Sequence, residues 1–126
     1  MSEPIFILVV EDDPILKNLL GHTFAGKYQT LYASSGQEGL TLFETYKPGL
    51  VLLDLMLPGE VDGFGVLQTI RARTDEYKDV PVIVVSNLSS PADMEKTKAM
   101  GANDYLVKAE VAVEDIVNKI EATLAK

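Results

Sequence analysis

The sequence contains no cysteine, and its only histidine is His22. Without cysteine the chain forms no disulfide and no thiolate metal site, and it has no cysteine nucleophile for catalysis. His22 falls near the end of a predicted helix, far in sequence from the acidic residues described below. We therefore expect this histidine to lie on the surface and not to act as a ligand.

Long apolar runs and basic residues are also scarce. The longest apolar run, residues 5–10, is too short for a membrane span or a signal-peptide core, and no basic segment precedes it. Lys and Arg number 11 against 19 Asp and Glu, a formal net charge of −8. This charge disfavours nucleic acid and favours a metal ion or a protein partner. We expect one soluble, cytoplasmic domain, residues 1–126, with no direct nucleic-acid or membrane partner.

Five short apolar segments, each followed by a helical pattern, make up nearly the whole sequence. Unbroken runs such as IFILVV are typical of strands buried on both faces of a parallel sheet. We expect an α/β fold, a doubly wound (βα)5 parallel sheet of the flavodoxin-like type with strand order 2-1-3-4-5. The expected strands are residues 5–10, 28–33, 50–53, 80–85 and 104–107. The expected helices end near residues 24, 46, 73, 100 and 124, and residues 74–79 are expected to form a loop.

Most of the expected helices begin with a capping residue. Asp13 stands in the N-cap position of the first helix, and Ser35 with Glu38 forms a capping-box pattern at the second. The fourth helix differs from the others in its thin apolar face, which has Met94 and Ala99 at most. We expect this helix to be weakly anchored to the rest of the domain.

Polar side chains follow four of the five expected strands. Glu11 and Asp12 follow the first strand, Asp54 the third, Ser86 the fourth and Lys108 the fifth. The carboxyl ends of parallel strands meet at one edge of the sheet, where α/β proteins bind ligands. Each residue alone has a plainer interpretation as a helix cap, a loop hydroxyl or a surface charge. Their joint position at one edge predicts a functional site.

The residue types at this edge indicate phosphoryl chemistry. Three neighbouring carboxylates repel one another unless a cation lies between them. Oxygen ligands with room for water favour Mg²⁺ over Ca²⁺. An ammonium and a hydroxyl beside that metal are suited to bind a phosphoryl group, and a carboxylate there is able to act as the nucleophile and form an aspartyl phosphate.

The segments LVVEDDP, LLDLMLPG, DGF, PVIVVS and GANDYLVK resemble a response-regulator receiver domain of two-component signalling. The resemblance extends from residue 5 to residue 124, and its acidic pair, strand-end aspartate, serine and lysine are specific in order and spacing. It implies a phosphoacceptor signalling domain in a phosphorelay and not an enzyme in the usual sense. The partners it implies are a sensor histidine kinase or phosphotransfer protein, and a downstream protein target or output domain.

The resemblance also implies a role for each matching residue. Asp54 is expected to accept the phosphoryl group from a phosphohistidine. Asp12 is expected to bind Mg²⁺ directly and Glu11 mostly through water, with Asp54 and the backbone carbonyl of Met56 completing the protein ligands. Lys108 is expected to bond the phosphoryl group.

Three more residues are interpreted in the same way. Ser86 matches the hydroxyl that moves toward the phosphate, and Tyr105 matches the aromatic switch that rotates inward when the hydroxyl moves. Asp13 is expected to cap the first helix and not to bind the metal.

The chain departs from the family pattern at three places near the site. Ala109 follows Lys108 where the family usually has a proline joined by a cis bond. Since a cis bond before a non-proline residue costs about 3 kcal/mol, we expect a trans bond and an altered loop. Asn87 stands where a small alanine is common, and its amide could add a hydrogen bond or crowd the site. Residues 59–61 make the loop before Asp62 one residue longer than expected, so we expect a bulge there.

Two apolar residues concern the lifetime of the phosphorylated state. Met56 lies two positions after Asp54, and Leu88 lies two positions after Ser86. In the family these positions tune hydrolysis of the aspartyl phosphate. Neither side chain can orient a water for attack, so we expect slow self-dephosphorylation.

Three alternatives remain open from the sequence. A flavodoxin-type flavin binder shares the topology, but residues 11–13 would repel a phosphate, and the glycines at 63 and 65 form no dinucleotide fingerprint. A phosphatase of the haloacid dehalogenase type needs a second aspartate at the position of Met56. A degenerate receiver would keep the fold and serve as a phosphorylation-independent protein-interaction module.

Overall fold

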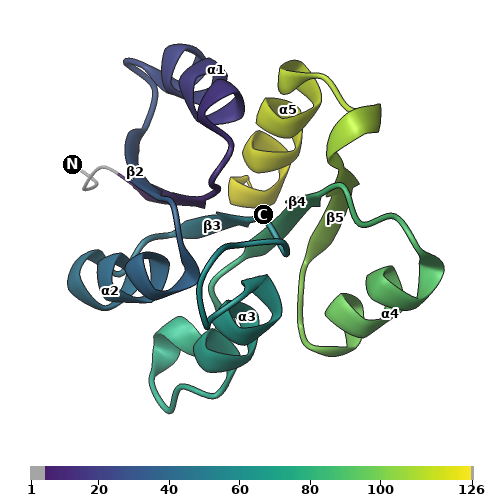
Figure 1. Ribbon diagram of the computed structural model, residues 1–126. Coiled ribbons are helices and arrows are strands. Elements are labelled where there is room, and N and C mark those ends of the chain that lie inside the picture. Colours follow the sequence, from purple (N-terminus) through teal and green to yellow (C-terminus); the bar gives the residue numbers. More distant parts are fainter. Residues whose placement is uncertain (1–4, 126) are drawn as a thin grey trace.

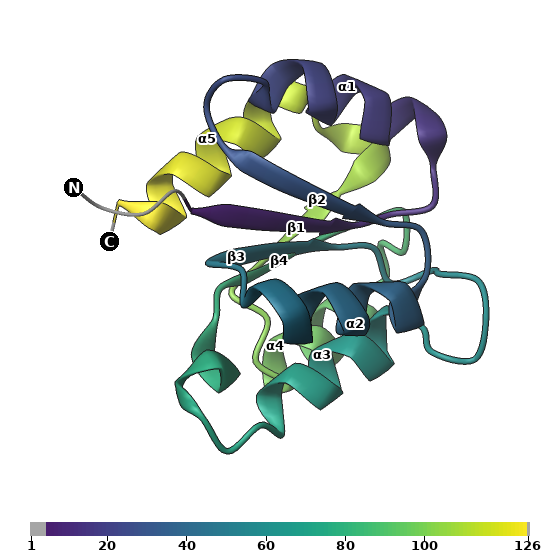
Figure 2. The same cartoon turned by 90° about the vertical axis from the view of Figure 1, so that its left-hand side faces the viewer.

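The computed structural model describes residues 5–125 as a five-stranded parallel sheet with the strand order β2-β1-β3-β4-β5. This is the expected (βα)5 topology. The strands are β1 (Phe6–Val10), β2 (Gln29–Ala33), β3 (Leu50–Leu53), β4 (Val82–Ser86) and β5 (Asp104–Val107). All five carboxyl ends lie at one edge of the sheet, on the right in Figure 2.

Helices cover both faces of the sheet. The helices are α1 (Pro14–Phe24), α2 (Gly36–Tyr46), α3 (Gly63–Arg71), α4 (Pro91–Ala99) and α5 (Val113–Leu124). Helices α1 and α5 lie on one face, and α2, α3 and α4 lie on the other (Figures 1 and 2). No helix in the described residues 5–125 is both long and apolar enough to cross a membrane.

Alternating strand residues divide the core into two layers. Ile7 and Val9 of β1 face α1 and α5, whereas Leu8 and Val10 face α2 and α3. The same alternation holds in β3, and every residue of β1 after Phe6 is less than 2% exposed. Successive side chains of a strand point to opposite faces, so strands covered on both sides need a continuous apolar run.

Local hydrogen bonds explain where the helices begin. The Asp13 carboxylate accepts a bond of 2.9 Å from the backbone N–H of Ile15, and Ser35 Oγ accepts one of 3.1 Å from Glu38. Each bond satisfies an N–H that the first turn of a helix leaves free. The expected N-caps at these two positions are confirmed. The capping box expected at Ser35 is not closed, because the Glu38 carboxylate accepts from the Ser34 N–H and not from the Ser35 N–H.

The expected secondary structure is wrong chiefly in two places. Residues 74–79 are not a plain loop, because a short 3₁₀ helix, η1 (Glu76–Asp79), forms there with Asp75 as its N-cap. The fourth strand begins two residues later than expected, since the N–H of Val80 bonds to the Tyr77 carbonyl and not to the sheet. The fifth strand forms over residues 104–107, as expected, and it is half-buried because it lies at the edge of the sheet.

Helix α4 is the most weakly anchored helix, as expected. The side chain that anchors it is not one of the two that were expected. Ala99 is exposed and Met94 is half-buried, whereas the fully buried side chain of α4 is Thr97. The Thr97 hydroxyl bonds to the carbonyls of Asp93 and Met94, so its polar atom is satisfied within the helix. Lys96 adds a contact with α3, its ammonium lying 4.2 Å from the centre of the Phe64 ring.

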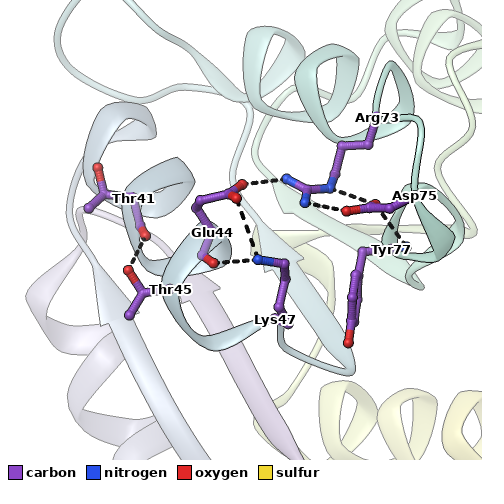
Figure 3. A network of polar contacts seen from close by, with 7 residues as sticks. All are labelled: Thr41, Glu44, Thr45, Lys47, Arg73, Asp75 and Tyr77. Atoms are coloured by element: carbon purple, nitrogen blue, oxygen red, sulfur yellow. Dashed lines mark hydrogen bonds and ion pairs between the residues drawn. The ribbon is translucent and has the colours of Figure 1, made fainter.

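Two arginines near the end of α3 connect this helix to neighbouring segments through different kinds of contact. Arg71 donates to the backbone carbonyls of Lys78 (2.7 Å) and Gly101 (2.8 Å), so it joins α3, η1 and the α4–β5 turn. Arg73 instead forms ion pairs of 2.6 Å with Glu44 and Asp75, which Figure 3 shows beside Lys47 and Tyr77. Because the two carboxylates are largely exposed, solvent screens the Arg73 pairs.

We expect Arg71→Ala to lower the free energy of unfolding by about 2 kcal/mol, since charge-assisted bonds to backbone carbonyls are lost. Arg73→Ala, the matched control, should cost much less, and 1 M NaCl should remove most of its effect. Urea denaturation at low and high salt measures both. Equal losses for the two variants would contradict this assignment.

Candidate functional site

Three carboxylates meet at the carboxyl edge of the sheet. Strands β1 and β3 are neighbours with Val10 paired to Leu53, so the residues that follow each strand lie side by side. One oxygen each from Glu11, Asp12 and Asp54 lies within 4.8 Å of the others. Glu11 and Asp54 are buried, at 3% and 4% exposure, whereas Asp12 is exposed. The cluster is thus open to solvent on the Asp12 side.

Lys108 connects β5 to this cluster. Its ammonium nitrogen lies 2.9 Å from Glu11 Oε2 and 3.0 Å from Asp54 Oδ2. The second oxygen of Asp54 accepts a bond of 3.1 Å from the Met56 N–H, and Glu11 Oε1 accepts one of 3.0 Å from Asp13. Every buried carboxylate oxygen of the cluster therefore has a donor.

The environment shifts the pKa values of two groups of this cluster, Glu11 and Lys108. Burial raises the pKa of the Glu11 carboxyl above its ordinary value, against the opposing effects of the Asp13 N–H and Lys108. Burial alone would lower the pKa of Lys108, but its hydrogen bonds to Glu11 and Asp54 outweigh burial and raise it. Lys108 therefore stays an ammonium at neutral pH, and the cluster keeps a fixed cation.

The donor set of the cluster fits a hard divalent cation. One ammonium cannot balance three carboxylates, and the charge left over matches that of a single divalent ion. The carboxylate that lacks an ion pair among the described residues, Asp12, is also the exposed one. Oxygen ligands with a solvent-facing side suit an ion that retains water.

Ser86 and Tyr105 do not join this cluster but connect to each other through Leu88. Ser86 is fully buried, and its Oγ accepts a bond of 3.3 Å from the Leu88 N–H. The Tyr105 hydroxyl donates to the Leu88 carbonyl. Within the described chain, Ser86 makes no hydrogen bond to the carboxylates or to Lys108. Sequence reasoning named Leu88 only for the lifetime of the phosphorylated state and missed this link, because it is made by backbone atoms that any residue carries.

The loops around the site carry the three departures noted in the sequence. The bond between Lys108 and Ala109 is trans, as expected, and the chain continues directly into a 3₁₀ helix, η2 (Lys108–Glu110). Asn87 is exposed, which does not support crowding of the site. The longer loop between β3 and α3 projects from the sheet edge in Figure 2, with Gly59 at a φ of +91°. His22 is exposed, as expected.

The comparisons with known proteins agree with this geometry. The family model "Response regulator receiver domain" matches residues 7–121. The chain belongs to the response-regulator receiver domain family. Among curated proteins, this receiver domain is 36% identical over 122 residues to the DNA-binding dual master transcriptional regulator RpaA of Synechocystis, a match that covers 95% of the chain and 49% of that protein. The chain spans less than half the length of the curated relatives it matches.

Solved structures match the receiver domain over nearly its whole length. The BeF₃-activated N-terminal receiver domain of Klebsiella pneumoniae RstA is 26% identical, with a TM-score of 0.83, and the match covers 96% of this chain and 99% of that one. The Mn²⁺-bound form of response regulator Rcp1 is also 26% identical, with a TM-score of 0.81 and coverage of 94% and 93%. The chain is thus a signalling domain of two-component systems, with an acidic cluster suited to metal binding.

We expect Asp12→Asn to stabilise the protein by about 0.5 kcal/mol when divalent cations are chelated, because a repulsive charge leaves the cluster. In MgCl₂ the order should reverse. The native chain should gain about 1.4 kcal/mol at ten times its Kd, and the variant should gain much less. Urea denaturation in chelator and in MgCl₂ measures both effects. Asp13→Asn removes the neighbouring charge but keeps a helix cap, so it should respond to Mg²⁺ like the native chain. An equal response in Asp12→Asn would contradict the assignment.

Proposed function

We propose that Asp54 accepts a phosphoryl group from the phosphohistidine of a sensor histidine kinase or phosphotransfer protein, with Mg²⁺ held at the acidic cluster. The observation that carries this proposal is the position of Asp54, a buried carboxylate bonded to Lys108 beside Glu11 and Asp12. Residues 1–126 would act as one receiver domain. Phosphorylation would change its surface for a downstream protein target or output domain, and not for direct contact with nucleic acid.

The residues of the site divide the chemistry among them. An Asp54 carboxylate oxygen would attack phosphorus as the phosphorus–nitrogen bond breaks. The electron pair of that bond would stay on the ring nitrogen, and the imidazole would leave as a neutral ring because its other nitrogen already carries a proton. Lys108, already within hydrogen-bonding distance of Asp54, would bond a phosphoryl oxygen and offset its charge. Asp12, Asp54 and the Met56 carbonyl would hold Mg²⁺, with Glu11 acting through water. The bound ion would neutralise charge on the transferring group.

The hydrogen bonds of Leu88 support a switch role for Ser86 and Tyr105. A buried hydroxyl that moved toward a phosphoryl group on Asp54 would give up its bond with the Leu88 N–H. The Leu88 carbonyl also holds the Tyr105 hydroxyl, so a shift of this residue would reach the surface near α4. Helix α4 is weakly anchored, which supports the proposal that a shift of Leu88 would change the surface around this helix.

Exposed apolar side chains beside the site support a protein phosphodonor. Ile15, in the first turn of α1, is 72% exposed, and Met56 is 58% exposed. Both follow closely on acidic residues of the cluster in sequence. A donor that carries a phosphohistidine to Asp54 has to approach over this edge, and it would cover these two side chains as it does so.

Incubation with MgCl₂ and acetyl phosphate should add one phosphoryl group to the native chain and none to Asp54→Asn, as intact mass measures. Asp62→Asn, an exposed acid on the adjoining loop, is the matched control and should be modified like the native chain. A folded native chain that gained no adduct would support a degenerate receiver instead, and an adduct on Asp54→Asn would place the acceptor elsewhere.

The phosphorylated chain should persist well beyond minutes, because Met56 and Leu88 offer no polar group to orient water. Met56→Asn should shorten this lifetime several-fold, since its amide is able to hold a water near the phosphoryl group. Met56→Leu preserves the apolar character and should leave the decay unchanged. Decay of the mass adduct after removal of the donor measures all three chains. A native lifetime of minutes or less would contradict the explanation.

A further inference from the structure

The first residue of α3 lies directly against the backbone of the proposed acceptor. Gly63 is buried, and its N–H donates a bond of 3.0 Å to the Leu55 carbonyl. This bond closes the loop that follows β3, so the start of α3 and the end of β3 are adjacent although nine residues separate them. Figure 2 shows the intervening loop bending away from the sheet edge and returning to α3.

The closeness of this contact leaves no room for a side chain at position 63. A Cβ on Gly63 would lie 2.2 Å from the Asp54 carbonyl oxygen, 2.5 Å from Leu55 Cα and 2.9 Å from the Asp54 carbonyl carbon. All three are backbone atoms, so no side-chain rotation could relieve the overlap. Glycine is required here for close approach of two backbone segments, not for an unusual φ.

Neither helix α3 nor strand β3 is free to retreat from an added methyl group. Helix α3 buries Val66, Leu67 and Ile70 completely against the sheet. On the other side, the Asp54 N–H is bonded to the Val10 carbonyl of β1 at 3.0 Å. The displacement would therefore fall on residues 54–56, whereas Glu11 and Lys108 are carried by other strands and would stay in place.

A second glycine contacts the far end of the same loop. A Cβ on Gly36, the first residue of α2, would lie 2.2 Å from the Val61 carbonyl oxygen and 2.9 Å from its carbon. The connection from residue 54 to residue 62 is thus held between two helix starts, one of which approaches its beginning and the other its end through a glycine. This contact anchors the segment that contains the extra residue of this chain.

We propose that Gly63, with Gly36 at the other end of the loop, is a positioning residue that sets the Asp54 carboxylate and the Met56 peptide relative to Glu11, Asp12 and Lys108. The proposal rests on the proposed function of Asp54 as phosphoacceptor. Both glycines act through the backbone and touch neither the metal nor the phosphoryl group. A shift of about 1 Å at a reacting group costs up to about 100-fold in rate, so this positioning has a measurable effect.

The test compares two glycines of the same helix. Gly63→Ala places its methyl group against Asp54, whereas Gly65→Ala meets only the Val61 side chain, at 3.2 Å, and Asp62 Oδ1, at 3.6 Å. Gly63→Ala should lower the rate of phosphorylation by acetyl phosphate about tenfold or more, and it should weaken Mg²⁺ binding several-fold in calorimetric titration. Gly65→Ala should stay within about twofold of the native chain in both measurements.

A third variant separates positioning from loss of stability. Gly39→Ala, on α2, would press on the two methyl groups of Val10, at 2.9 and 3.1 Å, and its three nearest atoms include none from residues 54–62. Its fold should weaken, but its folded fraction should bind Mg²⁺ and accept phosphoryl groups at close to the native rate. Circular dichroism in urea provides the folded fraction for all variants. If Gly63→Ala is recovered unfolded, Gly36→Ala is judged by the same two measurements.

The outcomes distinguish this proposal from the proposed function. Native rates and a native Mg²⁺ affinity in Gly63→Ala would overturn the positioning role, as would an equal loss in Gly39→Ala after correction for folding. If the native chain itself gains no adduct, the phosphoacceptor function fails. The Mg²⁺ affinities of Gly63→Ala and Gly65→Ala would then still decide whether Gly63 positions the acidic cluster.

Discussion

The mutual repulsion of Glu11, Asp12 and Asp54 is the constraint on which the rest of this structure depends. Two of these carboxylates are buried, and a charge pays heavily for burial unless a partner is close. The partner is Lys108, which directly follows the edge strand β5 and bonds both buried carboxylates. The strand order brings the end of β5 close enough to the cluster to supply this ammonium.

The domain around this cluster combines rigid and loosely held parts. Strands β1, β3 and β4 are covered on both faces, and the glycines at the starts of α2 and α3 allow those helices to approach the acceptor loop closely. Helix α4 has one buried side chain, and the segment before it contains Leu88, whose N–H and carbonyl bond to Ser86 and Tyr105. In the proposed function, the rigid part would hold the phosphoryl group, and the loosely held part would change its conformation in response.

Much of the site could be predicted because its side chains follow buried strands. An unbroken apolar run such as LVLL identifies a doubly covered strand, and the next residue, Asp54, then has to lie at the ligand-binding edge. The errors concern features that periodicity does not encode. The 3₁₀ helix η1 depends on the Asp75 cap, and the buried residue of α4 is a threonine that bonds within its own helix.

The sequence by itself determined the fold class, the strand order and the residue types that gather at the sheet edge, because these follow from apolar runs, capping residues and the right-handed connection of parallel strands. Only the tertiary structure decided which of these groups touch. It pairs Lys108 with both Glu11 and Asp54, bonds Ser86 to the Leu88 N–H, and brings Gly63 against the Asp54 backbone. Contacts of this kind depend on distances between segments far apart in sequence and on backbone atoms common to all residues, so no local pattern of side chains specifies them.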